Sequence, residues 1–229
     1  MSDSVHKLNV KPIKHGERSA RNVKSEISAY KRRLILEEAS HLFYEQGYEG
    51  TTLDAIADRL NVTKPFIYSY YHNKAEILHE ISERGIRLCL ELLDEAMALV
   101  ETPTQKLHIV VERVMTMIIE NQEYIVVYQR EEKNLESSVA RDIRKLRKAF
   151  DDRLEQLLDD GVATGEFDVP DTAFAAISIS GMMSWTANWY LPKGRRSASE
   201  IVVQTWQIVW RMVGTKRTSP STGPLKKSD

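Results

Sequence analysis

Residues 51–78 read TTLDAIADRLNVTKPFIYSYYHNKAEIL and contain two short helical patterns on either side of a sharp turn. The first pattern opens at Thr51, whose hydroxyl is suited to cap the free amides of a helix start. Asn61 stands at the turn, and asparagine tolerates a left-handed backbone better than most residues other than glycine. Thr63 opens the second pattern, and Pro65 falls in its first turn, where it costs no hydrogen bond. The stretch therefore predicts a helix-turn-helix.

The expected packing of this motif depends on three residues. Ala57 is small enough to let the two helices approach closely, while Val62 and Ile67 fill the angle between them. Elsewhere, apolar residues recur at helical spacing, and no convincing alternation predicts a strand. We therefore expect an all-α protein. Its other helices are predicted at residues 28–46, 74–100, 105–121, 123–133, 137–162, from residue 171 onward, and at 199–213.

The composition is that of an ordinary globular protein. The chain has 229 residues, of which 42% are hydrophobic and 28% charged, and its net charge is −1. This apolar fraction suffices for a core and excludes wholesale disorder and fibrous classes. The lone cysteine, Cys89, cannot pair within the chain, which excludes a disulfide scaffold and a cysteine zinc site. Because residues 1–31 hold no apolar run, we expect no secretory signal and a cytoplasmic protein.

The near-neutral total hides an asymmetry of charge. Residues 1–74 hold 12 Lys and Arg against 9 Asp and Glu, a net charge of +3, which leaves −4 for the remainder. The first residues are the most basic, and we predict that residues 1–27 form a flexible basic arm. Residues 215–229 are rich in Ser, Pro, Gly and Lys, a composition that predicts a disordered tail.

The last predicted helix, residues 199–213, carries apolar residues on two sides. One monomer core can cover only one of them, so we expect a second subunit to cover the other and predict a homodimer. No charged residue occurs between Asp171 and Lys193, which raises the question of a membrane span. Polar residues such as Ser180 and Asn188 interrupt this segment, so we expect a helix buried in protein and no membrane partner.

The spacing of residues 31–78 resembles the DNA-binding signature of the TetR family of one-component bacterial transcriptional regulators. A run of this length is far more specific than a lone short motif. It departs from the family pattern at Asn61, where glycine is usual, and at Tyr70 and Tyr71, which replace a histidine–phenylalanine pair. The resemblance is carried by Thr51, Thr52, Leu53, Ile56, Ala57, Asn61, Val62, Ile67, Tyr68, Tyr70, Tyr71, Lys74 and Leu78.

The resemblance implies two domains. An N-terminal three-helix helix-turn-helix DNA-binding domain is expected at residues 28–73, followed by a helical ligand-binding and dimerisation domain at residues 74–214. It also implies a dimeric repressor, which a small-molecule effector releases from a double-stranded DNA operator. A dimer presents its two recognition helices to major grooves about 34 Å apart or a multiple of that distance, so the operator should be near-palindromic.

In a helix-turn-helix, outward residues of the second helix reach the bases and phosphates of the major groove. We expect Lys64, Tyr68 and Ser69 to read bases. The resemblance implies that Thr51 or Thr52, together with Tyr70 and Lys74, holds the DNA backbone. Alternatively, Thr51 and Thr63 are helix caps only and the tyrosines are core residues. The basic arm is a candidate for flanking groove contacts. The complete set of candidate DNA contacts is Thr51, Thr52, Thr63, Lys64, Tyr68, Ser69, Tyr70 and Lys74.

The C-terminal part resembles TetR regulators that sense acyl-coenzyme A thioesters, through residues 128–135, 161–167 and 181–200. This implies a pocket for a small hydrophobic effector of that class, lined by aromatic side chains with polar tips. For each aromatic residue, core packing or a dimer interface is the alternative. The candidate ligand-binding residues are Tyr128, Arg130, Met182, Trp185, Asn188 and Trp189. The candidate cations for coenzyme A phosphates are Arg144, Arg147, Lys193, Arg195 and Arg196.

Two other functions compete with this hypothesis. The first is a TetR-type regulator that responds to a different hydrophobic ligand or to a drug instead of an acyl-coenzyme A thioester. A helical metal-dependent enzyme would use His72, Glu76, His79 and Glu83, whose spacing places them on one helical face. The pattern lacks the two-histidine zinc motif, and the chain has no phosphate-binding glycine loop or nucleophile elbow. We therefore expect no enzyme, no metal and no cofactor.

Overall fold

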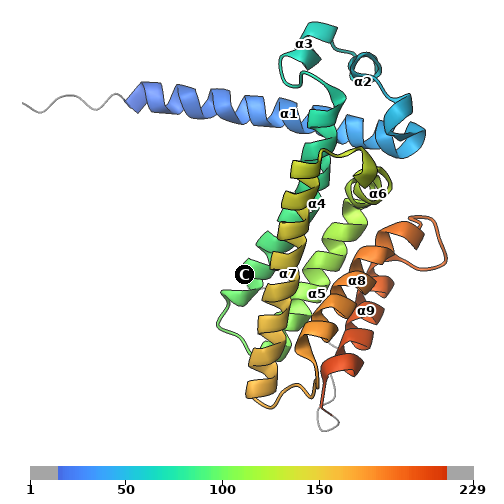
Figure 1. The fold of residues 1–229 in the computed structure, drawn as a ribbon. Coiled ribbons are helices and arrows are strands. Elements are labelled where there is room, and N and C mark those ends of the chain that lie inside the picture. Colours follow the sequence, from blue (N-terminus) through green and yellow to red (C-terminus); the bar gives the residue numbers. More distant parts are fainter. Residues whose placement is uncertain (1–14, 216–229) are drawn as a thin grey trace, which may run out of the picture.

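The computed structural model describes residues 15–215 of the chain (Figure 1). No strand occurs within this range apart from one isolated bridge between Phe167 and Gly214, so the expected all-α class is confirmed. A short 3-10 turn, η1 (Glu132–Asn134), follows α6. The helices are α1 (His15–Gly50), α2 (Leu53–Arg59), α3 (Lys64–Tyr68), α4 (Lys74–Met97), α5 (Pro103–Glu120), α6 (Gln122–Glu131), α7 (Ser137–Ala163), α8 (Thr172–Trp189) and α9 (Ala198–Val213).

Helices α1 to α3 pack around an N-terminal core because each buries one apolar stripe. Asn61 has a φ of 53°, which confirms the left-handed turn expected there. The amide of Val62 donates to the carbonyl of Ala57 at 3.0 Å and closes the turn. The expected helix-turn-helix is thus formed. Its buried residues include Ile35, Ala39, Leu42 and Phe43 on α1, Ile56 and Ala57 on α2, and Ile67 on α3.

The start of α2 differs from the expectation by one threonine. Thr52, not Thr51, caps α2, because its hydroxyl accepts a hydrogen bond from the amide of Ala55 at 3.1 Å. Thr51 is buried, and its hydroxyl donates to the carbonyl of Gly47 at 3.0 Å. Gly47 itself has a φ of 77° and interrupts the regular part of α1, where a stop was expected. Thr63 occupies the N-cap position of α3 without a capping hydrogen bond from its side chain.

The first helix is longer than expected at its N-terminal end. It begins at His15, so the backbone of residues 15–27 is helical where the sequence predicted a flexible arm. No glycine or proline occurs between residues 17 and 46, so nothing in the sequence stops the helix there. In Figure 1 this end of α1 projects from the molecule on the side away from α8 and α9. The other predicted parts of the arm and tail, residues 1–14 and 216–229, lie outside the described residues.

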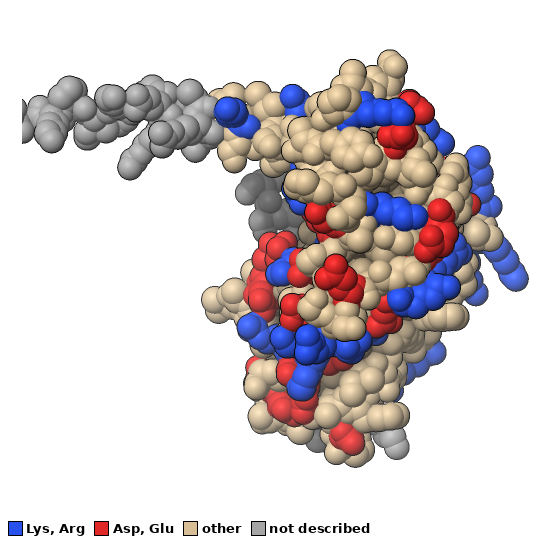
Figure 2. Space-filling model, turned by 45° about the horizontal axis from the view of Figure 1, so that its top comes forward, with Lys and Arg blue, Asp and Glu red and all other residues tan. Residues whose placement is uncertain are grey.

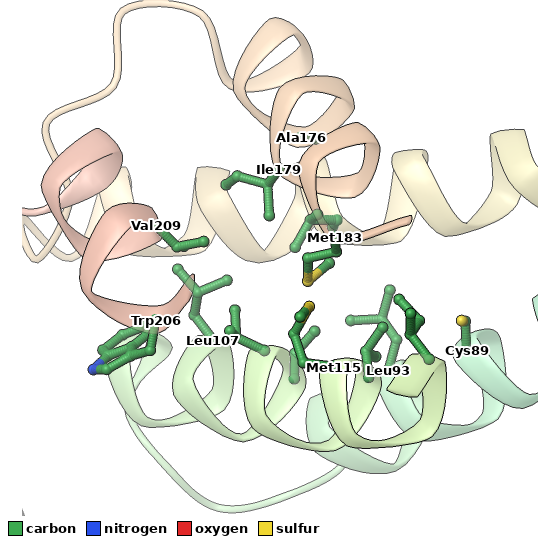
Figure 3. Packing of buried hydrophobic residues seen from close by; sticks show 14 of the residues in the cluster. Cys89, Leu93, Leu107, Met115, Ala176, Ile179, Met183, Trp206 and Val209 are labelled. Atoms are coloured by element: carbon green, nitrogen blue, oxygen red, sulfur yellow. The ribbon is translucent and has the colours of Figure 1, made fainter. Parts of the chain in front are cut away.

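Helices α4 to α9 form a second and larger core, into which α4 leads directly from the helix-turn-helix (Figure 1). Met115 on α5 and Met183 on α8 point toward each other across this core (Figure 3). Near the end of α7, Gly161 packs so closely that an added Cβ would lie 1.9 Å from the Phe167 ring. Only glycine fits there.

Helix α6 contributes to both cores. Tyr124 and Val127 pack into the N-terminal core, whereas Val126 packs into the C-terminal one. The N-terminal core is therefore completed by residues from beyond the expected boundary at residues 73 and 74. The contacts of α6 with both cores do not mark a clean division of the chain, so the domain boundary at residues 73 and 74 stays a prediction.

The other helices begin and end within a few residues of their predicted positions. The start of α5 moves forward to Pro103 because Thr102 and Gln105 form a capping box. Capping boxes and single caps also fix the starts of the last two helices, at Asp171 and Ser197. Across residues 15–215, no helix is long and apolar enough to cross a membrane.

Candidate DNA-binding surface and effector cavity

The outer face of α3 is open to solvent at the residues expected to read DNA bases. Tyr68 is 50% exposed, and Thr63, Lys64 and Ser69 are exposed as well. On the opposite face, Ile67 is fully buried, which fixes the rotation of the helix. Lys and Arg side chains are scattered with acidic ones over this end of the molecule, not gathered in one continuous patch (Figure 2).

The exposed polar groups of α3 are held by weak local contacts. The ammonium of Lys64 lies 2.5 Å from a carboxylate oxygen of Asp54 on α2, and this hydrogen bond raises the pKa of Lys64. Both side chains are open to solvent, so the pair contributes little stability, and a phosphate group can compete with Asp54. The Ser69 hydroxyl donates to the Phe66 carbonyl at 2.7 Å. Tyr70 is half-buried, with its ring centroid 5.3 Å from that of Phe66.

Two residues expected to hold the DNA backbone are engaged inside the protein. The ammonium of Lys74 donates to the carbonyls of Tyr48 at 2.7 Å and Glu49 at 3.4 Å, and lies 4.2 Å from the Tyr48 ring centroid. It thereby satisfies the last carbonyls of α1. Thr51 is buried, as described above, whereas Thr52 remains exposed. The structure therefore does not place Thr51 or the Lys74 ammonium on the surface formed by α3.

A hydrogen-bond network behind α3, in which Tyr71 is buried and Arg32 and Glu80 are partly exposed, was not predicted. Tyr71 is fully buried, and its hydroxyl donates to Glu80 Oε2 at 2.8 Å. Arg32 Nε donates to the same oxygen at 2.8 Å, and its guanidinium lies 4.5 Å from the Tyr71 ring centroid. Burial raises the pKa of Tyr71, which stays neutral. This network ties α1 to α4 and fixes the end of the recognition helix. The sequence offered no signal for it, because Arg32 and Glu80 are 48 residues apart.

The histidine–glutamate set forms two local pairs at the start of α4. His72, which precedes α4, lies 3.4 Å from Glu76, and His79 lies 3.9 Å from Glu83 along the helix. Among residues 15–215, no group of three or more His, Cys, Asp or Glu residues is placed to hold a metal ion. The four residues of the metal-dependent alternative therefore form no such group.

A cavity with two adjoining lobes of about 80 and 70 Å³ runs between α4 and the helices α5 to α8. Its wall is mostly apolar. Ser82, Tyr124 and Tyr128 line the first lobe, and their hydroxyls are buried without a hydrogen-bond partner in the described part of the chain. Such a cavity can hold a small apolar group together with one polar atom. Five residues are common to both lobes: Ile86, Cys89, Ile118, Arg147 and Ser184.

Of the six predicted ligand-binding residues, only Tyr128 lines this cavity. Trp185 and Trp189 are 62% and 50% exposed on the outer side of α8. Asn188 donates to Gln129 at 2.6 Å. A predicted cation, Arg147, also lines the cavity, with its guanidinium 5.9 Å from the Tyr128 ring centroid. The remaining two residues, half-buried Met182 and exposed Arg130, do not line it.

The two tryptophans lie outside this cavity, and spacing along a helix does not reveal which side faces outward. The structure places them in an apolar face on α8 and α9. On α9, Trp206 and Trp210 are buried, whereas Ile208 and Met212 are exposed. A face of this kind marks a contact surface. Its exposed apolar residues are Phe174, Ile177, Trp185 and Trp189 on α8 and Ile208 and Met212 on α9, whereas the exposed Val203 lies on another side of α9.

An ion pair joins the helix-turn-helix to α6. His41 Nδ1 on α1 lies 2.9 Å from a carboxylate oxygen of Glu123, and its other ring nitrogen lies 3.2 Å from Glu45. The hydrogen bond to Glu123 raises the pKa of His41 above its usual value of 6.5. At low pH, therefore, the charged histidine holds the two parts together.

This pair predicts a pH dependence of stability. Because the folded-state pKa of His41 is raised, its stabilising contribution is complete below pH 6.5 and disappears as the pH rises through the folded pKa. His41→Gln is therefore expected to lower the melting temperature most below pH 6.5 and hardly at all in alkaline buffer. The side chains are partly exposed, so the effect stays below about 1 kcal/mol. Thermal melts of both proteins across this range check it, and a constant difference at all pH values would contradict it.

Comparison with known proteins bears on both parts of the chain. Residues 35–81 match the family of bacterial regulatory proteins called tetR, and residues 100–213 match the C-terminal domain family described as tetracycline repressor-like. The HTH-type transcriptional regulator YhgD of Bacillus subtilis is 29% identical over 160 residues, which cover 67% of this chain and 82% of YhgD.

Two crystal structures extend the likeness to the whole fold. A TetR/AcrR-family regulator from Thermobifida fusca is 32% identical, with a TM-score of 0.64, over 78% of this chain and 95% of that one. AibR in complex with isovaleryl coenzyme A and operator DNA is 25% identical, with a TM-score of 0.68, over 78% of this chain and 97% of that one. The matched families and these relatives are transcriptional regulators, none of them an enzyme. The chain belongs to the TetR family of DNA-binding transcriptional regulators.

Proposed function

We propose that the protein is a dimeric repressor that binds a near-palindromic operator and is released from it by a small hydrophobic effector. The observation that carries this proposal is the arrangement along α4. This helix begins beside the exposed face of α3 and continues as one wall of the cavity, where Ser82, Ile86 and Cys89 lie. A ligand that displaces this wall changes the position of the recognition helix in the same step.

We assign the contacts to DNA according to exposure. Lys64, Tyr68 and Ser69 read bases in the major groove, because they are exposed on the face of α3 opposite its buried residue. Thr52, Thr63 and Tyr70 contact the DNA backbone from positions beside them. Thr51 and Lys74 position these groups through their hydrogen bonds to carbonyls at the end of α1.

Tyr68→Ala is expected to weaken operator binding by about 1–3 kcal/mol per half-site, because the ring is the largest exposed group on α3. The melting temperature should stay unchanged, since the side chain is half open to solvent. Tyr68→Phe separates the ring from its hydroxyl. Fluorescence anisotropy with operator and unrelated DNA measures the effect. An equal loss on both DNAs would show that Tyr68 contacts only the backbone.

The dimer forms through the apolar face on α8 and α9. Both helices carry exposed apolar side chains, and they lie along one edge of the molecule (Figure 1). An exposed apolar area of this kind is rare on a monomer, and a twofold pairing buries it against itself. The two recognition helices then face the same side of a duplex.

The effector we propose is an acyl-coenzyme A thioester with a short acyl group. The relative AibR, whose crystal structure holds isovaleryl coenzyme A, supports this class. The two lobes of about 80 and 70 Å³ are far smaller than the roughly 300–1,000 Å³ of sites for drug-sized ligands. A short branched acyl group fits with little displacement. Arg147 at the cavity is available to a phosphate or a thioester oxygen.

Ser184→Leu is expected to weaken effector binding at least tenfold, about 1.4 kcal/mol. Ser184 lies in the wall common to both lobes, so a larger side chain fills the space that the acyl group needs. DNA binding without effector should be unchanged. Trp189→Ala, by contrast, should weaken the dimer and leave effector affinity intact. Effector titrations of the protein–DNA complex distinguish these outcomes. The exposed Thr116→Leu on α5 is the control for added bulk.

The proposed function as a whole is tested with DNA from upstream of the protein's own coding sequence. Anisotropy across a salt series should show steep weakening with salt and, for one sequence, binding that resists competitor DNA. Isovaleryl coenzyme A and longer thioesters are then added, with free acids and drugs as alternatives. If a drug released the DNA and no thioester did, the proposed acyl-coenzyme A effector would be wrong, but the proposal of a ligand-responsive regulator would stand.

A further inference from the structure

A second cleft, of about 390 Å³, lies where the helix-turn-helix meets the C-terminal part. It is lined by Glu37 and Ser40 on α1, Arg84 on α4, residues 119–124 at the junction of α5 and α6, and Pro192. Only Tyr124 is common to this cleft and the effector cavity. The cleft thus touches both parts of the molecule at once, and its volume lies within the range of small-molecule sites. We call it the junction cleft.

Three polar groups in the wall of the junction cleft are buried and have no hydrogen-bond partner in the described part of the chain: Ser40 Oγ, Arg84 Nε and Tyr124 Oη. Ser40 is 1% exposed and Tyr124 6%. Within residues 15–215, Arg84 forms no ion pair within 4 Å, and its guanidinium lies 5.7 Å from the Tyr124 ring centroid. Arg84 also borders a larger cleft, which Glu76, Glu80, Glu83 and Glu91 line as well. A buried donor without an acceptor is costly. All three residues line the same cleft and carry groups that can donate to an anionic oxygen, which favours a carboxylate as the ligand group.

The other charges of the junction cleft are negative. Glu37, Glu120 and Glu123 line it, so its carboxylates outnumber the Arg84 guanidinium. Glu123 is paired with His41. Glu37 lies only within a long 4.0 Å contact of Arg33, on the exposed helix surface. A purely anionic ligand would be repelled by these groups, and a purely cationic one would leave the three donors unsatisfied. Only a ligand that carries both a negative and a positive charge can pair with the three donors and with the carboxylates of the cleft.

We propose that the junction cleft binds a small zwitterion, an α-amino acid. Its carboxylate accepts hydrogen bonds from Arg84, Ser40 and Tyr124, and its ammonium lies against Glu37 and Glu120. The N-terminal end of α6, which Asn121 leaves without a side-chain cap, adds a favourable dipole for the carboxylate. Ile119 and Pro192 provide the apolar part of the wall.

A ligand in this cleft would join α1 to α4 and α6 and so restrict how the helix-turn-helix moves against the rest. The consequence for DNA rests on the proposed function, whereas binding itself does not. For this reason the test measures binding in the absence of DNA.

The experiment is isothermal titration of the full-length protein with the common L-amino acids, one at a time. For any amino acid that binds, the matched carboxylic acid without its amino group and the matched amine without its carboxylate are titrated next. We expect both analogues to bind at least about tenfold more weakly. Arg84→Gln and Ser40→Ala should weaken binding about ten- to a hundredfold and about tenfold, respectively. Arg87→Gln, one turn along α4 and outside the cleft, is the matched control and should leave the affinity unchanged.

Three results would overturn the proposal. The first is that no amino acid binds, which would mean that water alone satisfies the three groups. The second is that an analogue with one charge binds as well as the zwitterion. The third is that both Arg84→Gln and Ser40→Ala still bind the amino acid, which would place its site elsewhere. This titration does not measure operator binding. A negative result would therefore reject amino-acid binding in the junction cleft and leave the proposed function untouched. Conversely, a protein that binds no operator could still be shown to bind an amino acid there.

Discussion

Replacing Trp185 and Ile208 together by glutamate is expected to leave the protein monomeric and to weaken operator binding more than about a hundredfold. Both side chains belong to the exposed apolar face on α8 and α9. Pairing that face would bury two unpaired carboxylates per subunit, which no gain in apolar contact offsets. A monomer holds only one half-site, so it loses the high local concentration that a dimer gives the second recognition helix. Sedimentation and anisotropy on the same samples measure both effects.

The control for this variant is Val100→Glu, which adds one carboxylate at a fully exposed apolar residue outside the face. It should stay dimeric and bind the operator normally. The double variant should keep its helical content and melting cooperativity, because neither residue is in a core. A double variant that remains dimeric would show that another surface holds the subunits together.

Tyr71→Ala is expected to destabilise the N-terminal core by about 3–5 kcal/mol and to abolish operator binding, although Tyr71 lies too deep to touch DNA. The ring is fully buried behind α3, and its removal leaves a cavity beside the recognition helix. It also removes the surface on which the Arg32 guanidinium rests. Chemical denaturation followed by circular dichroism, together with anisotropy, checks this.

Tyr71→Phe separates the two contributions of this residue. It keeps the ring and removes only the donor to Glu80, so we expect a loss of about 1–3 kcal/mol, with operator binding retained at low temperature. Glu80 keeps its contact with Arg32, which limits the cost. If Tyr71→Phe lost operator binding while remaining folded, the hydroxyl would have a direct role in DNA recognition that its burial argues against.

The helix-turn-helix was predictable because its determinants are local. The spacing of Ala57, Asn61 and Ile67 specifies two short helices and a left-handed turn within eleven residues, and all three behave as expected. The outward residues of α3 followed from the same periodicity. The choice between Thr51 and Thr52 as the cap of α2 could not be predicted from periodicity. It depends on the end of α1, where the Gly47 carbonyl accepts a hydrogen bond from the Thr51 hydroxyl and leaves Thr52 to cap α2.

The cavity could not be predicted, for a different reason. Its wall combines residues from helices that are distant in sequence, such as Ser82 and Ser184, and each looks like an ordinary core position in its own helix. The sequence favours aromatic residues with polar tips as a pocket lining, but spacing on α8 cannot distinguish an inward from an outward tryptophan. The position of the Lys74 ammonium was equally unpredictable, since the carbonyls that it satisfies belong to the end of α1.

Periodicity, turn chemistry and caps act over a few residues, and so the amino-acid sequence was enough to specify an all-helical chain, the recognition helix and the family. Which apolar side of α8 and α9 stays uncovered, where a cavity opens, and which charged groups are left without partners follow from long-range packing. Those features depend on the relative placement of whole helices, a property that no local pattern encodes.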